Sequence, residues 1–221
     1  VVNLQEAANR TSINARGAGT AFVNPADLIK DAQAAAIGAP GQKAADIMQA
    51  MQSFVSMTGE LGTARESAGT FATVAAATGS NVGDVSKAAG SIYNQFGLKT
   101  KEEMQDVLAS LTFQGKQGAF ELSDAASQFQ RLAAAGASFG LTGSKGVKTI
   151  GGLAQIARTG TGSAEQTTTA IENIFTNLIA KSAILKGQGV NVYDKGGKTR
   201  DVTEVLIEAI AKSGKGNFEK K

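Results

Sequence analysis

Apolar residues recur three and four positions apart along most of this chain, which is the spacing of the buried face of an α-helix. The pattern is clearest over residues 82–96, where the apolar positions are Val82, Val85, Ala89, Ile92, Tyr93 and Phe96. The same spacing predicts helices over 42–58, 63–77, 101–114, 122–135, 144–158 and 163–186, and one that begins at Pro25 and ends before Pro40. Residues 1–20 are ambiguous, because Leu4 and Ala8 fit a helix that Gly17 and Gly19 would end.

Small residues and glycine separate the predicted helices, and a serine or threonine opens the next one. Three such joints lie at residues 77–80, 135–138 and 158–161. Thr100 and Glu103 have the spacing of a capping box, in which each side chain bonds the backbone of the other. Because short connections place consecutive helices side by side, we expect a compact bundle of short helices. The joints show no fixed period, so a solenoid is the less favoured alternative.

Residues 190–200 depart from the helical pattern. Residues 190–193 alternate apolar and polar side chains, as a short strand does. Asp194 and the glycines at 196 and 197 suit a tight turn, and residues 198–200 would form the return strand. Asp201 then caps a final helix, with Glu204 three residues on. The sequence therefore predicts a mainly α fold with one small β-hairpin at about residues 190–200.

This order of elements resembles the core region of phage tail tape measure proteins. Members of that family place a hairpin of the form Gly-Val-x-Val-x-Asp-x-x-Gly after a long helix, and here it runs from Gly189 to Gly197. An amphipathic helix rich in Leu and Ile follows in both. The resemblance covers about residues 62–213, including the glycine-punctuated helices upstream of the hairpin.

The composition excludes several kinds of chemistry. The chain has neither cysteine nor histidine, which removes disulfides, thiolate and imidazole metal sites, and Ser-His-Asp or Cys-His catalysis. Its net charge of +3, from 22 basic and 19 acidic residues, is too balanced to predict specific nucleic-acid binding. No apolar run is long enough to span a bilayer, and no secretory signal is visible.

Three groups of residues could still suggest a site. Residues 197–199 read Gly-Lys-Thr, but a phosphate-binding loop needs a glycine five positions earlier, where Val192 stands. Turn chemistry explains Asp194 without a metal. The acidic residues that could suggest glycoside hydrolysis are Glu60, Glu66, Glu102 and Glu103, and the last two are better explained as first-turn helix residues. We therefore predict a non-enzymatic chain with no catalytic, metal or cofactor-binding residue.

The resemblance implies a structural virion protein that sets tail length during assembly and leaves the tail ahead of the DNA to assist genome delivery. It implies contact with tail tube proteins, distal tail or tip proteins and tail assembly chaperones, and later with the host envelope. A homo-oligomer is expected, with a trimer as one possibility. The implied locations are the tail lumen or tip, the host cytoplasm during assembly, and the host envelope on infection.

Two rival functions are a membrane-active, pore-forming or toxin-like helical module and a muralytic enzyme of unseen type. Partition into detergent or liposomes would test the first, because a tape measure core should stay soluble in isolation. We expect three parts: a helical arm and linker at residues 1–60, the core domain at 61–214, and a frayed basic tail at 215–221.

Overall fold

The fold is almost entirely helical. The computed structural model describes residues 3–17, 19, 22–117, 120 and 122–217, which contain eleven helices. The helices are α1 (Leu4–Gly17), α2 (Pro25–Ile37), α3 (Ala44–Thr58), α4 (Leu61–Thr78), α5 (Val82–Phe96), α6 (Lys101–Gln117), α7 (Leu122–Ser138), α8 (Gly143–Arg158), α9 (Ala164–Ala180), α10 (Ser182–Gly187) and α11 (Val202–Asn217).

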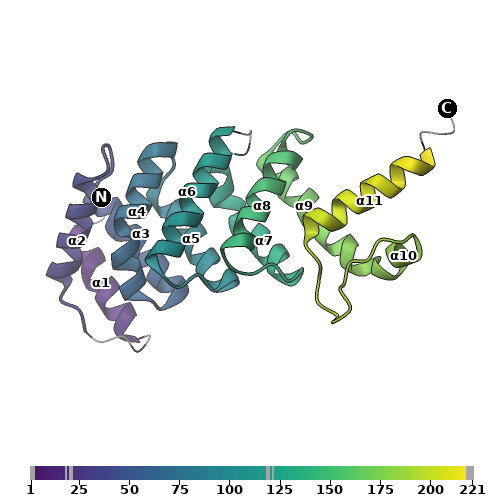
Figure 1. Cartoon of the computed structure of the whole chain (residues 1–221). Helices are drawn as coiled ribbons and strands as arrows, with labels where there is room; N and C mark the ends of the chain where they lie inside the picture. The colour runs from purple at the N-terminus through teal and green to yellow at the C-terminus, as the bar shows by residue number, and fades with distance from the viewer. Residues whose placement is uncertain (1–2, 18, 20–21, 118–119, 121, 218–221) are drawn as a thin grey trace.

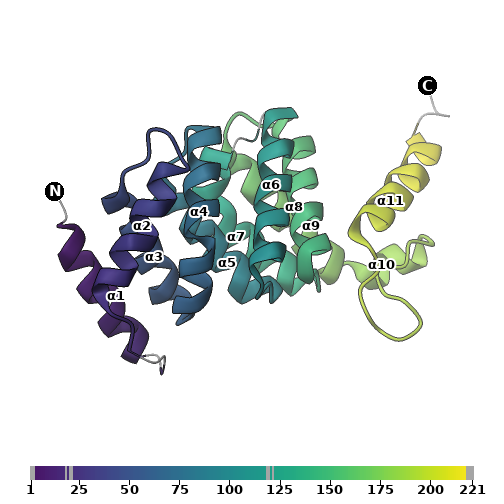
Figure 2. The same cartoon turned by 60° about the vertical axis from the view of Figure 1, so that its left-hand side comes forward.

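Helices α1 to α9 form two layers (Figures 1 and 2). Each odd-numbered helix packs against the next odd-numbered helix, and the contacts of α5 with α3 and α7 are the most extensive. The even-numbered helices α2, α4, α6 and α8 pack in the same way beside them. The result is an elongated array of antiparallel helix pairs, as in an α-solenoid. The prediction of a compact bundle was therefore wrong in its architecture, although the predicted helical class is confirmed.

The helix pairs recur at a nearly constant spacing. The odd-numbered helices α1 to α9 begin at residues 4, 44, 82, 122 and 164, so successive pairs start 38 to 42 residues apart. Side-chain hydrogen bonds join neighbouring helix pairs. Between α5 and α3, Ser86 Oγ donates to the Ala50 carbonyl and Asn94 Nδ2 donates to the Met57 carbonyl. Because each pair buries its apolar face on its neighbours, the core runs continuously along the array.

The two ends of the array differ from its middle. Nine of the fifteen residues of α5 are buried, because α5 lies between α3 and α7 and also touches α4 and α8. The outward faces of the end helices are instead mostly polar. They carry Gln5, Glu6, Asn9 and Arg10 on α1, and Glu165, Gln166, Thr169 and Asn173 on α9. Exposed polar side chains therefore cover much of α1 and α9, whereas α5 is largely enclosed by its neighbours.

Glycine lets α8 approach α7 and α5 closely. A Cβ at Gly136 would lie 2.2 Å from Ile150 Cδ1, and a Cβ at Gly146 would lie 3.1 Å from the Phe96 ring. Both distances are shorter than ordinary van der Waals contact. A larger residue at either position would therefore crowd the neighbouring helix.

Most predicted helices are present within a few residues of the expected bounds, and the predicted bounds of α5 are matched in full. The ambiguous first segment is helical over Leu4–Gly17. The helix predicted over 163–186 is divided at Lys181 into α9 and α10. Residues 163–186 contain neither glycine nor proline, so no local signal marks this break.

The predicted β-hairpin was wrong, since the described residues contain no strand. The segment between α10 and α11 is a loop with one isolated antiparallel bridge between Tyr193 and Thr199. Backbone hydrogen bonds across the loop flank this bridge, but the pairing extends no further because both ends of the loop bond to the helices instead. The Val190 N–H bonds the Leu185 carbonyl at the end of α10, and Asp201 Oδ1 accepts from Thr203 at the start of α11.

The division of the chain at residue 60 remains a prediction. α3 on one side of that position packs against α4 and α5 on the other, so the two layers continue across it. α11 extends to Asn217, and residues 218–221 of the predicted tail lie outside the described residues.

Candidate functional site

The loop between α10 and α11, which carries the family-like sequence pattern, is shaped by Asp194. Its Oδ1 accepts the backbone N–H groups of Gly196 at 2.8 Å and Lys198 at 2.9 Å. Gly197 has φ +79°, a left-handed conformation that glycine adopts without strain. The predicted turn chemistry of Asp194 and Gly197 is therefore confirmed, although the flanking strands do not form.

A chain of ion pairs ties this loop to α11. Arg200 Nη1 donates to Glu208 Oε2 at 2.8 Å and also to the Asn191 carbonyl. Lys212 Nζ donates to Glu208 Oε1 at 2.8 Å and also contacts the Gly189 carbonyl. Hydrogen bonds from Lys212 and Arg200 lower the pKa of Glu208 below its ordinary value. Glu208 thus holds both ends of the loop against one helix.

The loop also docks onto α8. Lys145 Nζ lies 2.8 Å from Asp201 Oδ2, and this contact lowers the pKa of Asp201 and raises that of Lys145. Gly140 leaves room for Thr199, whose Oγ1 would lie 2.5 Å from a Cβ at position 140. Four buried valines complete the attachment, namely Val190, Val192, Val202 and Val205. α11 is therefore anchored by its first turns and by the loop.

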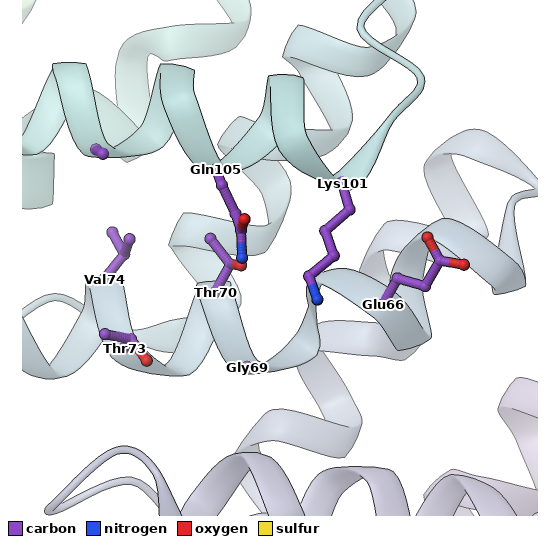
Figure 3. Close-up of a pocket in the computed structure, with 8 residues that line it drawn as sticks. Glu66, Gly69, Thr70, Thr73, Val74, Lys101 and Gln105 are labelled. Atoms are coloured by element: carbon purple, nitrogen blue, oxygen red, sulfur yellow. The ribbon is translucent and has the colours of Figure 1, made fainter.

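A groove between α4 and α6 is the second candidate surface. It is an open hollow of about 340 Å³ in which Lys101 and Gln105 extend from α6 toward Thr70 and Gly69 of α4 (Figure 3). Glu66 also lines the groove, but no ion pair joins it to Lys101 among the described residues. Its lining combines apolar surface with a few polar and charged side chains, and the groove is open to solvent on one side.

The structure places the acidic residues considered in the sequence analysis in separate surroundings. Glu103 forms the predicted capping box, because its Oε2 accepts from the Thr100 N–H and the Glu103 N–H donates to Thr100 Oγ1. These bonds lower the pKa of Glu103. Glu60 precedes α4, Glu66 lies in the groove, and Asp194 lies in the distant loop. In the part of the chain that the structure describes, no three acidic residues are placed to hold a metal ion.

Among the helices of the described residues, none is both long enough and apolar enough to cross a bilayer.

The resemblance noted above agrees with comparisons to known proteins. The phage-related minor tail protein family matches residues 30–220. Among curated proteins, the chain is similar to the "Probable tape measure protein" of Burkholderia phage BcepMu, with 28% identity over 111 residues. That match covers 50% of this chain and 13% of the relative, so the chain corresponds to a small part of that protein's length. No solved structure matches.

The family match extends over most of the chain and includes the α10–α11 loop and both helical layers from α2 onward. The resemblance to phage tail tape measure proteins is therefore confirmed, and with it a structural role in a phage tail. The chain belongs to the phage-related minor tail protein family.

Proposed function

We propose that this chain is the folded core segment of a tail tape measure, which sets tail length during assembly. The family match over residues 30–220 carries this proposal, and similarity to a named tape measure protein supports it. In the proposed mechanism, tail tube subunits polymerise around the tape measure until its extent is covered. A single helix supplies about 1.5 Å of length per residue.

The two-layer array suggests that the folded segment and the length-setting segment are different parts of the full-length protein. Each helix pair contains 38 to 42 residues from start to start. Neighbouring packed helices lie about 8–10 Å apart, whereas about 40 residues in one extended helix span about 60 Å. The folded array therefore spans little distance for its number of residues. We assign the length-setting role to helical sequence elsewhere in the full-length protein.

The later steps are part of the same proposal. The protein would leave the tail ahead of the DNA and assist genome delivery through the host envelope. Its partners would be tail tube proteins, distal tail or tip proteins, assembly chaperones and further copies of itself, with a trimer among the possible assemblies. It would occupy the tail lumen or tip in the virion. The three-part division at residues 1–60, 61–214 and 215–221 belongs to this proposal too.

Electron microscopy of mutant tails tests the length-setting role. One phage would carry a duplicated helix pair, residues 82–117, within this segment. A second phage would carry an equal number of residues inserted into a helical region outside it. We expect the second insertion to lengthen tails by about 54 Å, at about 1.5 Å per residue, and the first by about 10 Å or less. Tails whose length does not respond to the outer insertion would refute the proposal.

A further inference from the structure

The end of the chain forms a projecting unit, which we call the C-terminal unit and define as residues 181–217. It comprises α10, the following loop and α11, and it extends beyond the array in both views (Figures 1 and 2). α10 has no buried residue, and α11 makes no extensive contact with any other helix. The unit can therefore meet a large surface without interference from the two layers.

Unpaired positive charge gathers in this unit. Lys181, Lys186, Lys195 and Lys198 are exposed, and none of them has an ion-pair partner within the residues that the structure describes. The other lysines of the described side chains that lack such a partner are spread over the array at positions 43, 99, 101 and 116. The four lysines of the unit thus make the densest group of free cations that the described side chains provide.

The acidic residues of the unit neutralise other groups. Asp201 pairs with Lys145, and Glu208 pairs with Arg200 and Lys212. Glu204 lies 3.8 Å from Arg200. Asp194 is the acidic residue nearest the free lysines, and its Oδ1 is occupied by backbone N–H groups of the turn. The four free lysines therefore leave the surface of the unit with net positive charge.

Exposed apolar side chains gather in the same unit. Of the nine large hydrophobic residues that are exposed in the described part of the chain, four belong to it: Ile184 (63% exposed), Tyr193 (37%), Ile207 (64%) and Ile210 (68%). Tyr193 lines a hollow of about 490 Å³ together with Lys186 and Lys195. Lysine and tyrosine both place an apolar body beside a polar tip, as residues at a membrane–water interface do.

We propose that the C-terminal unit binds the surface of an anionic lipid bilayer. Its lysines would contact the anionic headgroups, and Ile184 with Tyr193 would enter the boundary between headgroups and acyl chains. A nucleic acid would satisfy the lysines but would leave the isoleucines in water, so the observations favour lipid. The inference names the part of the chain that would contact the host envelope during genome delivery, and it rests on the proposed function.

Vesicle binding tests the inference. The 221-residue chain is sedimented with vesicles of phosphatidylcholine alone, and with vesicles in which phosphatidylglycerol replaces one third of it. We expect binding only to the mixed vesicles, and release when salt is raised. Lys186→Gln with Lys195→Gln should weaken binding about 25-fold, at about fivefold per lysine. The matched control, Lys99→Gln with Lys116→Gln, makes the same charge change at and beside α6 and should have little effect.

A fluorescent reporter locates the contact. The chain has no tryptophan, so Tyr193→Trp introduces a single one. Its emission should shift to the blue on mixed vesicles, whereas Phe113→Trp, at a position that is 65% exposed on α6, should not shift. Circular dichroism confirms that each variant is folded.

Several results would overturn the inference. One is the absence of binding to the mixed vesicles. A second is an equal loss of vesicle affinity in the two double-lysine variants. A third is an emission shift in the Phe113→Trp variant that matches or exceeds the shift in the Tyr193→Trp variant. Duplex DNA binding that the first pair abolishes, with vesicle binding unchanged, would make the unit a nucleic-acid surface. Salt-resistant insertion with vesicle leakage would favour the pore-forming alternative. Tail length is measured separately, so failure of lipid binding is distinguishable from failure of the length-setting proposal.

Discussion

Gln114 of α6 occupies the space that a side chain at Gly151 of α8 would need. A Cβ at position 151 would lie 2.1 Å from Gln114 Oε1 and 2.7 Å from Leu111 Cδ2. In return, Gln114 Nε2 donates to the Lys148 carbonyl at 3.1 Å, which joins two helices of the same layer. The close approach of α6 and α8 therefore depends on the absence of a side chain at position 151.

Alanine at two adjacent glycines should have opposite effects. Gly151→Ala should lower the free energy of unfolding by about 1–3 kcal/mol, because the new methyl group overpacks the contact with Gln114. Gly152→Ala should raise it by up to about 1 kcal/mol, because alanine favours the helix and the nearest atom, Gln114 Nε2, is 4.0 Å away. Urea unfolding of both variants measures the difference. Equal changes in the free energy of unfolding for the two variants would show that packing at position 151 is looser than described.

Gly197→Val should destabilise the loop through its backbone alone. Position 197 has φ +79°, and a Cβ there would meet nothing within 4 Å. A β-branched residue in that conformation should cost about 1–3 kcal/mol. Gly197→Asn is the matched control and should cost less, since asparagine tolerates the left-handed region. Thermal unfolding checks both variants, and an unchanged midpoint for the valine variant would contradict the turn geometry.

The ion pair between Lys145 and Asp201 should make stability fall in acid. Because Lys145 lowers the pKa of folded Asp201, the stabilisation is complete above the unfolded value of about 3.9 and is lost as the pH falls through the lower folded value. Lys145→Gln should remove this part of the acid dependence. Lys30→Gln is the control, since Lys30 pairs with Asp27 at the exposed start of α2. Urea unfolding midpoints measured at pH values between about 2 and 7 would show whether Lys145→Gln loses this acid dependence. Parallel curves for wild type and Lys145→Gln would contradict the assignment.

The isolated chain should melt at a modest temperature. Aromatic residues make up only 5% of the sequence, so its small side chains bury less apolar area per residue. We expect a midpoint at or below the 45–65 °C that is roughly typical of mesophile domains, and a higher one in the presence of partner proteins. Calorimetry is the measurement. We base this expectation on the proposed exit through the narrow tail tube, for which a folded segment must rearrange. A midpoint above about 90 °C that does not depend on concentration or partners would contradict it.

Peptidoglycan zymography should show no clearing by this chain. Glu103 bonds the backbone at a helix start and Asp194 shapes a turn, and histidine and cysteine do not occur in the sequence. The triple variant Glu102→Gln, Glu103→Gln, Asp194→Asn should therefore behave as the wild type does. Clearing by the wild type that this variant loses would establish an enzyme and overturn the structural role.

The sequence by itself determined the helices and their caps, because these depend on contacts within a few residues. The 3.6-residue periodicity, roughly one helical turn, predicted α5 to the residue, and the spacing of Thr100 and Glu103 predicted their capping box. Gly90 and Gly151 could have meant either weak helices or close packing. The structure favours packing, since a Cβ at Gly90 would lie 3.2 Å from Met57 Sδ.

Only the tertiary structure decided the two-layer array and the end of the chain. The spacing between successive helix pairs varies from 38 to 42 residues. The contacts between neighbouring pairs involve residues of differing identity, so no sequence repeat reveals the array. The break at Lys181 and the single bridge at Tyr193 likewise have no local signal. The burial of the four valines and the pair between Lys145 and Asp201 hold the loop in place, and this pair joins residues that are distant in the chain.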